Sequence, residues 1–209
     1  MATIASAVVA AQKAWSRKPA DFYPTPHDAT QALLDHLRLP EGTLAWEPAC
    51  GDGDLSLVME AAGLDVVSTD IRDTGFGTVG DFLNDDLAVM SEWIITNPPF
   101  SLAQEFIRKA LSLAPNVAML LKGTYWHAAG RRALFEDRTP SEILPLTWRP
   151  AFLEKERGNS PIMEVCWNVW RQGEGSAFYR PLARPKGSRP RRRAAPPPPV
   201  DLDLDDLLS

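Results

Sequence analysis

The chain has 209 residues, 44% of them hydrophobic, and a formal net charge of −5. This length and composition suit one α/β domain with a proper core, and no apolar run approaches the length of a membrane span. The two cysteines, Cys50 and Cys166, and three scattered histidines lack the spacing of a disulfide framework or of zinc ligands. We therefore expect no metal site, and a cytoplasmic protein.

The first expected elements form the opening of a βαβ unit. A helix is expected after Thr25, with Thr25 as its N-cap and Pro26 at the first helical position. The apolar segment 44–47 then predicts a strand, Gly51-Asp52-Gly53 a turn, and the pattern at 55–62 a second helix. Strand, glycine turn and helix are typical of nucleotide-binding sites, because glycines let the backbone approach a ligand.

Acidic side chains crowd this turn, at Glu47, Asp52 and Asp54. The third glycine of the dinucleotide fingerprint is absent, so a pyrophosphate would be repelled, whereas an ammonium or sulfonium group would be attracted. The next strand, 64–69, ends at Asp70, where this fold commonly places a carboxylate on ribose hydroxyls. The simpler alternative for each acid is a solvated loop residue, but their order at successive strand ends favours a ligand site.

The strand expected at 93–96 ends in Asn97-Pro98-Pro99-Phe100. Two consecutive prolines remove two N–H donors and stiffen the turn. The amide oxygen of Asn97, a backbone carbonyl and the ring of Phe100 together suit a planar group that carries an exocyclic NH2. The alternative is a turn merely punctuated by prolines, and the acids upstream favour the functional interpretation.

Strands and helices continue to alternate after this turn. We expect a capping box at Ser101 with a helix that ends before Pro115, strands at 117–121, 143–148 and 163–170, and a helical region at 127–137. This alternation predicts an α/β fold with a doubly wound, mainly parallel sheet that binds ligands at the carboxyl ends of its strands.

Five segments in this order resemble one family, the class I S-adenosylmethionine-dependent methyltransferases, and within it the small phage-type DNA adenine methyltransferases. The segments are Asp21-Phe22-Tyr23-Pro24-Thr25-Pro26, Glu47-Pro48-Ala49-Cys50-Gly51-Asp52-Gly53, Asp70, Asp81-Phe82 and Asn97-Pro98-Pro99-Phe100. The resemblance covers residues 21–170 in unpermuted order. It implies a seven-stranded Rossmann-like methyltransferase fold and direct methyl transfer from S-adenosylmethionine to adenine N6 of a flipped DNA base, in a bacterium or a phage-infected host.

The resemblance also implies roles for particular residues. Asn97, Pro98, Pro99 and Phe100 would form the catalytic turn. The cofactor would be held by three sets of residues: Tyr23, Thr25, Pro26, Glu47, Cys50, Gly51 and Gly53 at its methionine part, Asp70 and Ile71 at the ribose, and Asp81, Phe82 and Asn97 at the adenine and the reacting end.

Other functions remain open from the sequence. Methylation of cytosine N4 in DNA is chemically equivalent at such a site. Enzymes that methylate ribosomal RNA guanines or protein glutamines also carry an Asn-Pro-Pro-Phe turn. A catalytically inactive binding module of the same fold is a third alternative, although intact acids and Asn97 argue against it.

The basic residues that a DNA partner would require are distributed unevenly along the chain. Residues 184–209 hold six Lys or Arg and four Asp, which leaves 16 basic and 23 acidic residues, a balance of −7, in the rest of the chain. An enzyme that must release DNA needs only a local basic patch. Candidate DNA contacts are Lys122, Arg131, Arg132, Arg149, Lys155 and Arg157, each of which could instead be an ordinary surface charge.

The composition divides the chain into three parts. Residues 1–20 are expected to form an N-terminal arm, 21–182 the methyltransferase domain, and 183–209 a disordered tail, rich in Arg and Pro and then acidic. The basic half of this tail suits DNA phosphates, and its acidic, leucine-containing end suits a protein partner. A plain solubilising tail is the alternative. The oligomeric state is not predicted.

Overall fold

The computed structural model describes residues 23–84, 87, 89–152, 163–174 and 176–187. The expected N-terminal arm, most of the tail, and the candidate DNA contacts Lys155 and Arg157 lie outside these residues. Among the described residues, no helix combines the length and apolar character needed to cross a membrane, and Cys50 and Cys166 are free, buried thiols.

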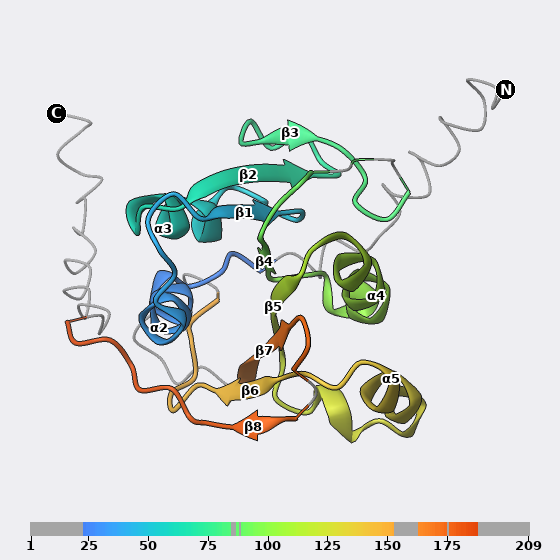
Figure 1. Ribbon diagram of the computed structural model, residues 1–209. Helices are drawn as coiled ribbons and strands as arrows, with labels where there is room; N and C mark the ends of the chain where they lie inside the picture. The colour runs from blue at the N-terminus through green and yellow to red at the C-terminus, as the bar shows by residue number, and fades with distance from the viewer. Residues whose placement is uncertain (1–22, 85–86, 88, 153–162, 175, 188–209) are drawn as a thin grey trace, which may run out of the picture.

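Helices and strands alternate along the described chain (Figure 1). The strands are β1 (Leu44–Glu47), β2 (Asp65–Asp70), β3 (Thr78–Val79), β4 (Trp93–Thr96), β5 (Asn116–Lys122), β6 (Glu142–Pro145), β7 (Val165–Arg171) and β8 (Phe178–Tyr179). The α-helices are α2 (His27–Leu37), α3 (Asp54–Ala61), α4 (Ala103–Leu113) and α5 (Arg132–Asp137), and short 3-10 turns cover Phe100–Leu102, Tyr125–His127 and Ala129–Arg131.

All eight strands join one sheet in the order β3-β2-β1-β4-β5-β7-β6-β8. Strands β1 to β5 pair in parallel, and β7 runs antiparallel to its neighbours β5 and β6. The doubly wound, mainly parallel sheet is therefore confirmed. It has eight strands rather than seven because the two-residue strand β8 pairs with the outer edge of β6, and so short a strand leaves no periodicity in the sequence.

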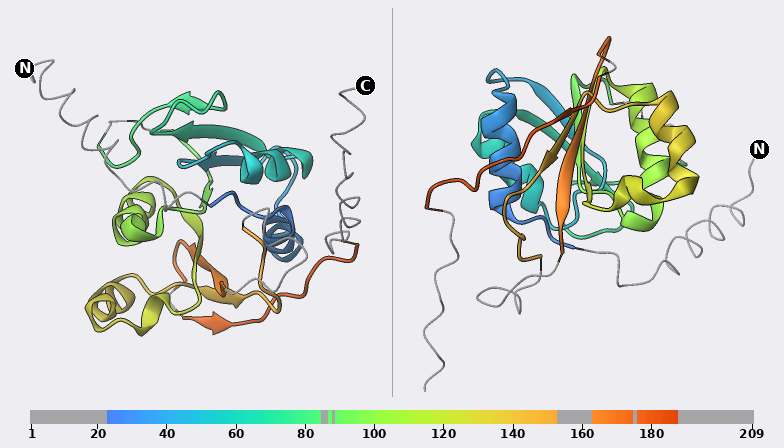
Figure 2. Two further views of the ribbon diagram at one scale, coloured as in Figure 1. Left: turned by 180° about the vertical axis from the view of Figure 1, so that it is seen from behind. Right: turned by 90° about the horizontal axis from the view of Figure 1, so that it is seen from below.

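Helices cover both faces of the sheet (Figure 2, right). Helices α2 and α3 pack on one face, and α4 and α5 on the other. Side chains of β5 alternate between the two cores: Ala118 and Leu120 face the first, and Val117 and Met119 face the second. The central strands are therefore buried on both sides, which explains their continuous apolar runs.

Two expected helix caps are wrong. Helix α2 begins at His27 with Pro26 in the N-cap position, while the hydroxyl of Thr25 accepts a tertiary hydrogen bond instead. Helix α4 begins at Ala103, and Ser101 lies inside the 3-10 turn that precedes it. Pro26 fixes the backbone at the start of α2, and a 3-10 turn capped by Pro99 precedes α4, so each helix starts later than side-chain type alone predicts.

The indole of Trp167 on β7 ties the sheet to α2, and its loss should destabilise the fold. The ring is fully buried, and its Nε1 donates to the carbonyl oxygen of Ala29 at 2.9 Å. Ala29 lies inside α2, so its carbonyl also accepts the helical N–H of Leu33. Trp167→Phe therefore removes the additional hydrogen bond and part of the buried ring volume, and we expect the free energy of unfolding in urea to fall by about 1–3 kcal/mol. Phe178→Leu, at an exposed aromatic on β8, is the control and should change it by less than about 0.5 kcal/mol. Equal midpoints would contradict this role.

Candidate functional site

The carboxyl ends of five neighbouring parallel strands lie at one edge of the sheet. In spatial order they carry Asp81 just after β3, Asp70 at the end of β2, Glu47 at the end of β1, Asn97 directly after β4, and Lys122 at the end of β5. The structure thus brings the acids and the Asn-Pro-Pro-Phe turn together along one line, at the edge where open α/β sheets bind ligands.

The turn between β1 and α3 depends on its glycines. Gly51 and Gly53 have φ angles of +55° and +91°, a region that L side chains rarely adopt. A Cβ atom on Gly53 would also lie 2.6 Å from the ring of Phe76. The backbone here is therefore closely packed at Gly53, and other residues at either position would adopt an unfavourable φ.

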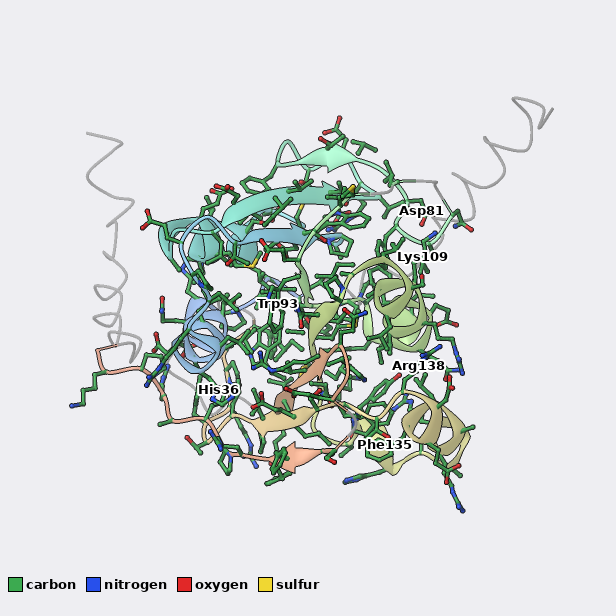
Figure 3. The ribbon with its side chains drawn as sticks, in the orientation of Figure 1. His36, Asp81, Trp93, Lys109, Phe135 and Arg138 are labelled. Atoms are coloured by element: carbon green, nitrogen blue, oxygen red, sulfur yellow. The ribbon has the colours of Figure 1, made fainter. Side chains whose placement is uncertain are left out.

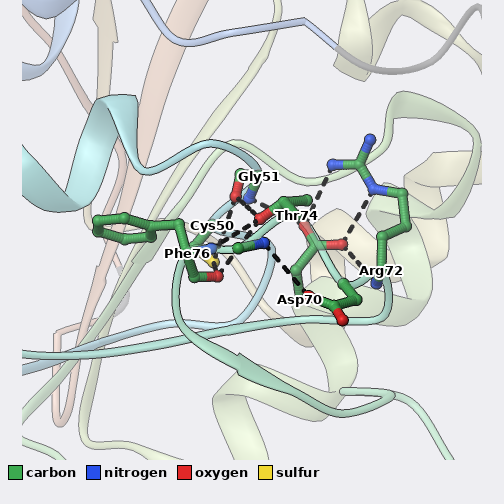
Figure 4. A network of polar contacts seen from close by, with 8 residues as sticks. Cys50, Gly51, Asp70, Arg72, Thr74 and Phe76 are labelled. Carbon is green, nitrogen blue, oxygen red and sulfur yellow. Dashed lines mark hydrogen bonds and ion pairs between the residues drawn. The ribbon is translucent and has the colours of Figure 1, made fainter.

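Asp70 fixes this turn to the end of β2 (Figure 4). The residue is 5% exposed. Oδ2 accepts a hydrogen bond from the Gly51 N–H at 2.9 Å, and Oδ1 accepts one from the Arg72 N–H at 2.9 Å and one from Arg72 Nε at 3.1 Å. Ile71, the next residue, is half-buried. Asp70 therefore organises the glycine turn in addition to any contact with a ligand.

A further segment at this edge, residues 74–77, was not recognised from the sequence. The Thr74 hydroxyl donates to the Gly51 carbonyl at 2.6 Å, and the Cys50 thiol lies 3.6 Å from the Phe76 carbonyl (Figure 4). Gly77 has a φ of +72°, and a Cβ there would meet the Ser68 carbonyl oxygen at 2.6 Å. The glycine-rich composition of 75–80 was the available signal, and it marks a close backbone approach rather than a flexible loop.

Glu47 is a buried acid with an unusual protonation state. Its residue is 1% exposed, and the Ser56 hydroxyl donates to its carboxyl oxygen. Burial raises the pKa of Glu47 to about 8, against the opposing hydrogen bond from Ser56, and the nearby negative charges of Asp70 and Asp54 raise it further. The carboxyl group is therefore largely protonated at neutral pH in the free protein.

The Asp81 and Phe82 pair is organised locally. Asp81 accepts hydrogen bonds from the Leu83 N–H at 3.0 Å and from the Asn84 side chain at 2.7 Å. The Phe82 ring is 2% exposed and packs against Trp46 and Phe106, at centroid distances of 5.2 and 4.8 Å. This ring is part of the core, so it presents no open face for the adenine stacking that the resemblance implied.

Asn97 has its amide group fixed by the segment before α2. Its Nδ2 donates to the carbonyl oxygen of Tyr23 and to the hydroxyl of Thr25, both at 3.1 Å. The other amide atom, Oδ1, is buried, and no described residue donates to it. Both N–H groups of the amide are thus bonded within the protein, and Oδ1 is an acceptor available to a bound ligand.

Aromatic and cationic groups surround the rest of the turn. The Phe100 ring lies 5.7 Å from the Tyr23 ring at an interplanar angle of 32°, and Lys122 Nζ lies 4.9 Å from the Phe100 centroid. Pro98 is buried, and the Pro99 carbonyl accepts the Leu102 N–H at 2.9 Å. The turn is therefore rigid, with a flat ring and a positive charge beside the amide.

The other candidate DNA contacts engage neighbours within the protein. The Arg131 guanidinium lies 4.0 Å from the centre of the Tyr125 ring. Arg132 pairs with Glu136, and Arg149 pairs with Glu164, each at 2.7 Å. Of the candidate cations within the described residues, Lys122 is the one that adjoins the Asn-Pro-Pro-Phe turn.

His27 and His36 each lie beside an acid rather than in a metal site. His27 Nε2 is 3.5 Å from an oxygen of Asp54, at the start of α3 beside the glycine turn. His36 on α2 lies beside β6, where its Nε2 is 2.5 Å from a carboxyl oxygen of Glu142, whereas Asp81 lies near the other end of the sheet (Figure 3). No group of three or more His, Cys, Asp or Glu side chains in the described chain could hold a metal ion. Burial raises the pKa of the Cys50 thiol to about 12, so it is not a ready nucleophile.

No protein-family model and no curated protein matches this chain. Solved structures do. A candidate RNA methyltransferase from Pyrococcus horikoshii matches with a TM-score of 0.59 and 17% identity, over 80% of this chain and 97% of that chain. A type I restriction-modification methyltransferase subunit from Streptococcus thermophilus gives 0.57 and 13%, over 77% and 47%. A candidate class I S-adenosylmethionine-dependent methyltransferase from Listeria monocytogenes gives 0.55 and 10%, over 86% and 71%.

These comparisons show the fold. Identities of 10–17% carry no residue-level information, but the match to the P. horikoshii protein extends over nearly all of that chain. The chain spans about half the length of the S. thermophilus subunit. It therefore has the Rossmann-like fold of class I methyltransferases, with its glycine turn, acids and Asn97 at the carboxyl edge of the sheet.

Glu47 should make stability depend on pH. Between its ordinary pKa of 4.5 and its folded pKa of about 8, the folded protein holds a proton that the unfolded chain has lost, so stability falls as pH rises through this window. Glu47→Gln has no such proton. Relative to wild type, we expect its free energy of unfolding to gain at least about 1 kcal/mol between pH 5 and pH 8, measured by urea unfolding without cofactor. Glu60→Gln, at an exposed glutamate on α3, should keep the wild-type dependence, and identical curves for all three proteins would refute the assignment.

Proposed function

We propose that this protein transfers a methyl group from S-adenosylmethionine to an exocyclic amino group of a DNA base, adenine N6 foremost. One observation carries the proposal: Asn97 Oδ1 is buried without a donor among the described residues, at the end of β4 and beside Phe100. An unpaired buried acceptor costs about 1–3 kcal/mol, which a bound N–H donor would recover. An amino group on a flat ring supplies that donor and stacks on Phe100.

The acids and glycines of the edge fit the proposed cofactor. S-adenosylmethionine supplies an electrophilic methyl group on a sulfonium and carries a second positive charge on its ammonium group. Glu47 and Asp70 place carboxyl groups beside the glycine turn between β1 and α3. Asp70 suits ribose hydroxyls, because carboxylate oxygens accept several hydrogen bonds. Asp81 remains a candidate for the adenine amino group, but Phe82 does not supply a stacking ring.

Asn97 and the turn around it perform the chemistry that the protein must supply. The lone pair of an aromatic amine is delocalised into its ring, so the nitrogen is a poor nucleophile. Asn97 Oδ1 and the Pro98 carbonyl would accept its two N–H bonds and favour a tetrahedral nitrogen whose lone pair points away from the ring. Because the turn is rigid, this geometry is set before the substrate arrives.

The choice of DNA rests on the resemblance and on the restriction-modification subunits among similar structures. RNA is the second candidate, because the P. horikoshii protein, described as a candidate RNA methyltransferase, is matched over 97% of its length. Cytosine N4 presents the same amino group as adenine N6. Methylation assays with labelled cofactor on DNA and RNA from methylation-deficient cells, followed by identification of the methylated base, decide among these.

The negative charge of Asp70 should contribute to cofactor affinity. Asp70→Asn keeps the shape and an acceptor for the Gly51 N–H, but it loses the charge and replaces the oxygen that accepts from Arg72 by an NH2 group. We expect calorimetry to show S-adenosylmethionine binding weakened by about 1–3 kcal/mol in the folded variant. Asp73→Asn, on the same loop but exposed, should bind as wild type does. Equal affinity in Asp70→Asn would remove Asp70 from the cofactor site.

Asn97 should govern turnover rather than cofactor binding. Asn97→Ala removes a preorganised acceptor, and we expect at least about a hundredfold loss of the methylation rate, with cofactor affinity nearly unchanged. The matched control is Asn116→Ala, at the opposite end of β5, where the side chain donates to the Glu92 carbonyl at 3.0 Å. Near-normal methylation by Asn97→Ala would place the catalytic centre elsewhere.

A further inference from the structure

We propose that Thr25 is a positioning residue, which holds the Asn97 amide at the angle that turns Oδ1 toward the substrate. The inference rests on the proposed function, and it gives Thr25 a role different from the cofactor contact that the resemblance implies. It starts from two hydrogen bonds that cross 74 and 72 residues of sequence, from Asn97 Nδ2 to the Tyr23 carbonyl and to the Thr25 hydroxyl.

The two acceptors do different work. The Tyr23 carbonyl can only accept, so it determines which amide atom faces residues 23–25: the nitrogen must, because an oxygen there would oppose another oxygen. A single hydrogen bond leaves the amide plane free to rotate. The Thr25 hydroxyl takes the second N–H and thereby fixes the plane, with Oδ1 directed away from this segment.

The orientation matters because an amide has two nearly isosteric ends. An amide turned end for end would present N–H groups to the N–H groups of the substrate amine, and no hydrogen bond would form. The observed orientation instead presents a buried acceptor that no described residue uses. The segment that fixes the amide therefore also determines whether the site can bind an amino group.

Residues 23–25, which hold the Asn97 amide, form a stiff segment. Thr25 lies between Pro24 and Pro26, whose rings restrict the backbone on both sides. The residue is 6% exposed, and its side chain provides no cap to α2. The Tyr23 ring adjoins both Phe100 and Phe152, at centroid distances of 5.7 and 5.9 Å. The hydroxyl is therefore delivered to Asn97 from a fixed position.

Thr25→Val tests this role, because valine has the same shape and lacks the hydroxyl. At saturating cofactor and DNA, we expect kcat to fall about tenfold or more, the value for one lost hydrogen bond of about 1.4 kcal/mol, while KM for S-adenosylmethionine stays within twofold. Thr25→Ser restores the hydroxyl and should recover most of kcat. A raised cofactor KM with normal kcat would overturn the proposal in favour of a cofactor contact, and wild-type kinetics would overturn it outright.

Thr30→Val is the matched control for burying a valine. Thr30 on α2 is fully buried, and its hydroxyl has no partner among the described residues, so this variant loses no hydrogen bond. It should leave kcat unchanged. An equal loss of kcat in Thr30→Val would show that the effect of Thr25→Val is a general disturbance of packing, which overturns the proposal.

A measurement without substrate separates this inference from the proposed function. In 15N–1H spectra, the Asn97 side-chain NH2 signals, assigned by their loss in Asn97→Asp, should be protected from hydrogen exchange in wild type and Thr25→Ser. Thr25→Val should accelerate exchange about tenfold or more, as expected for one hydrogen bond lost. Absence of methylation by the wild-type protein would refute the proposed function but would leave the exchange experiment valid. Unchanged exchange in Thr25→Val would overturn the positioning role of Thr25.

Discussion

Parallel pairing from β3 to β5 is the constraint on which the candidate site depends. Parallel strands need crossovers that return the chain to the same starting edge, so each strand ends on the same side of the molecule. Side chains that follow those strand ends therefore lie close together in space although they are far apart in sequence. The register also sets their spacing, since neighbouring strands lie about 4.8 Å apart. Every other feature of the site refines a line of residues that the sheet has already assembled.

Two sets of hydrogen bonds orient the residues of this line into a defined site. Asp70 pins the glycine turn to β2 through the Gly51 N–H, and residues 23–25 pin the amide of Asn97 to the end of β4. Both sets of hydrogen bonds join segments that are adjacent in space but distant in sequence. Because neither depends on a ligand, the polar groups are oriented before binding, which lowers the entropic cost of forming a reactive complex.

The sequence predicted the parts of the fold that carry strong periodicity or special backbone chemistry. Strand β4 was expected at 93–96, where it lies, because a largely apolar run ends abruptly at Asn97-Pro98. Strands β3 and β8, with two residues each, gave no such signal. The two wrong caps and the buried ring of Phe82 share one cause: side-chain type shows what Thr25, Ser101 or Phe82 can do, but the tertiary contact that decides between uses lies in another part of the chain.

Like charges at neighbouring strand ends impose a last requirement on the site. Glu47 and Asp70 end adjacent parallel strands, and Asp70 raises the pKa of Glu47 in addition to the larger effect of burial. The two acids have different surroundings. Asp70 accepts hydrogen bonds from Gly51 and Arg72, whereas Glu47 is hydrogen-bonded to Ser56 and keeps its proton. A positive group bound between them would favour the ionised form of Glu47. Two groups at this edge are thus incompletely paired in the free protein, among the residues that the structure describes. Within that part of the chain, Glu47 lacks a positive charge beside it, which a sulfonium would supply, and Asn97 Oδ1 lacks an N–H donor, which an amino group would supply.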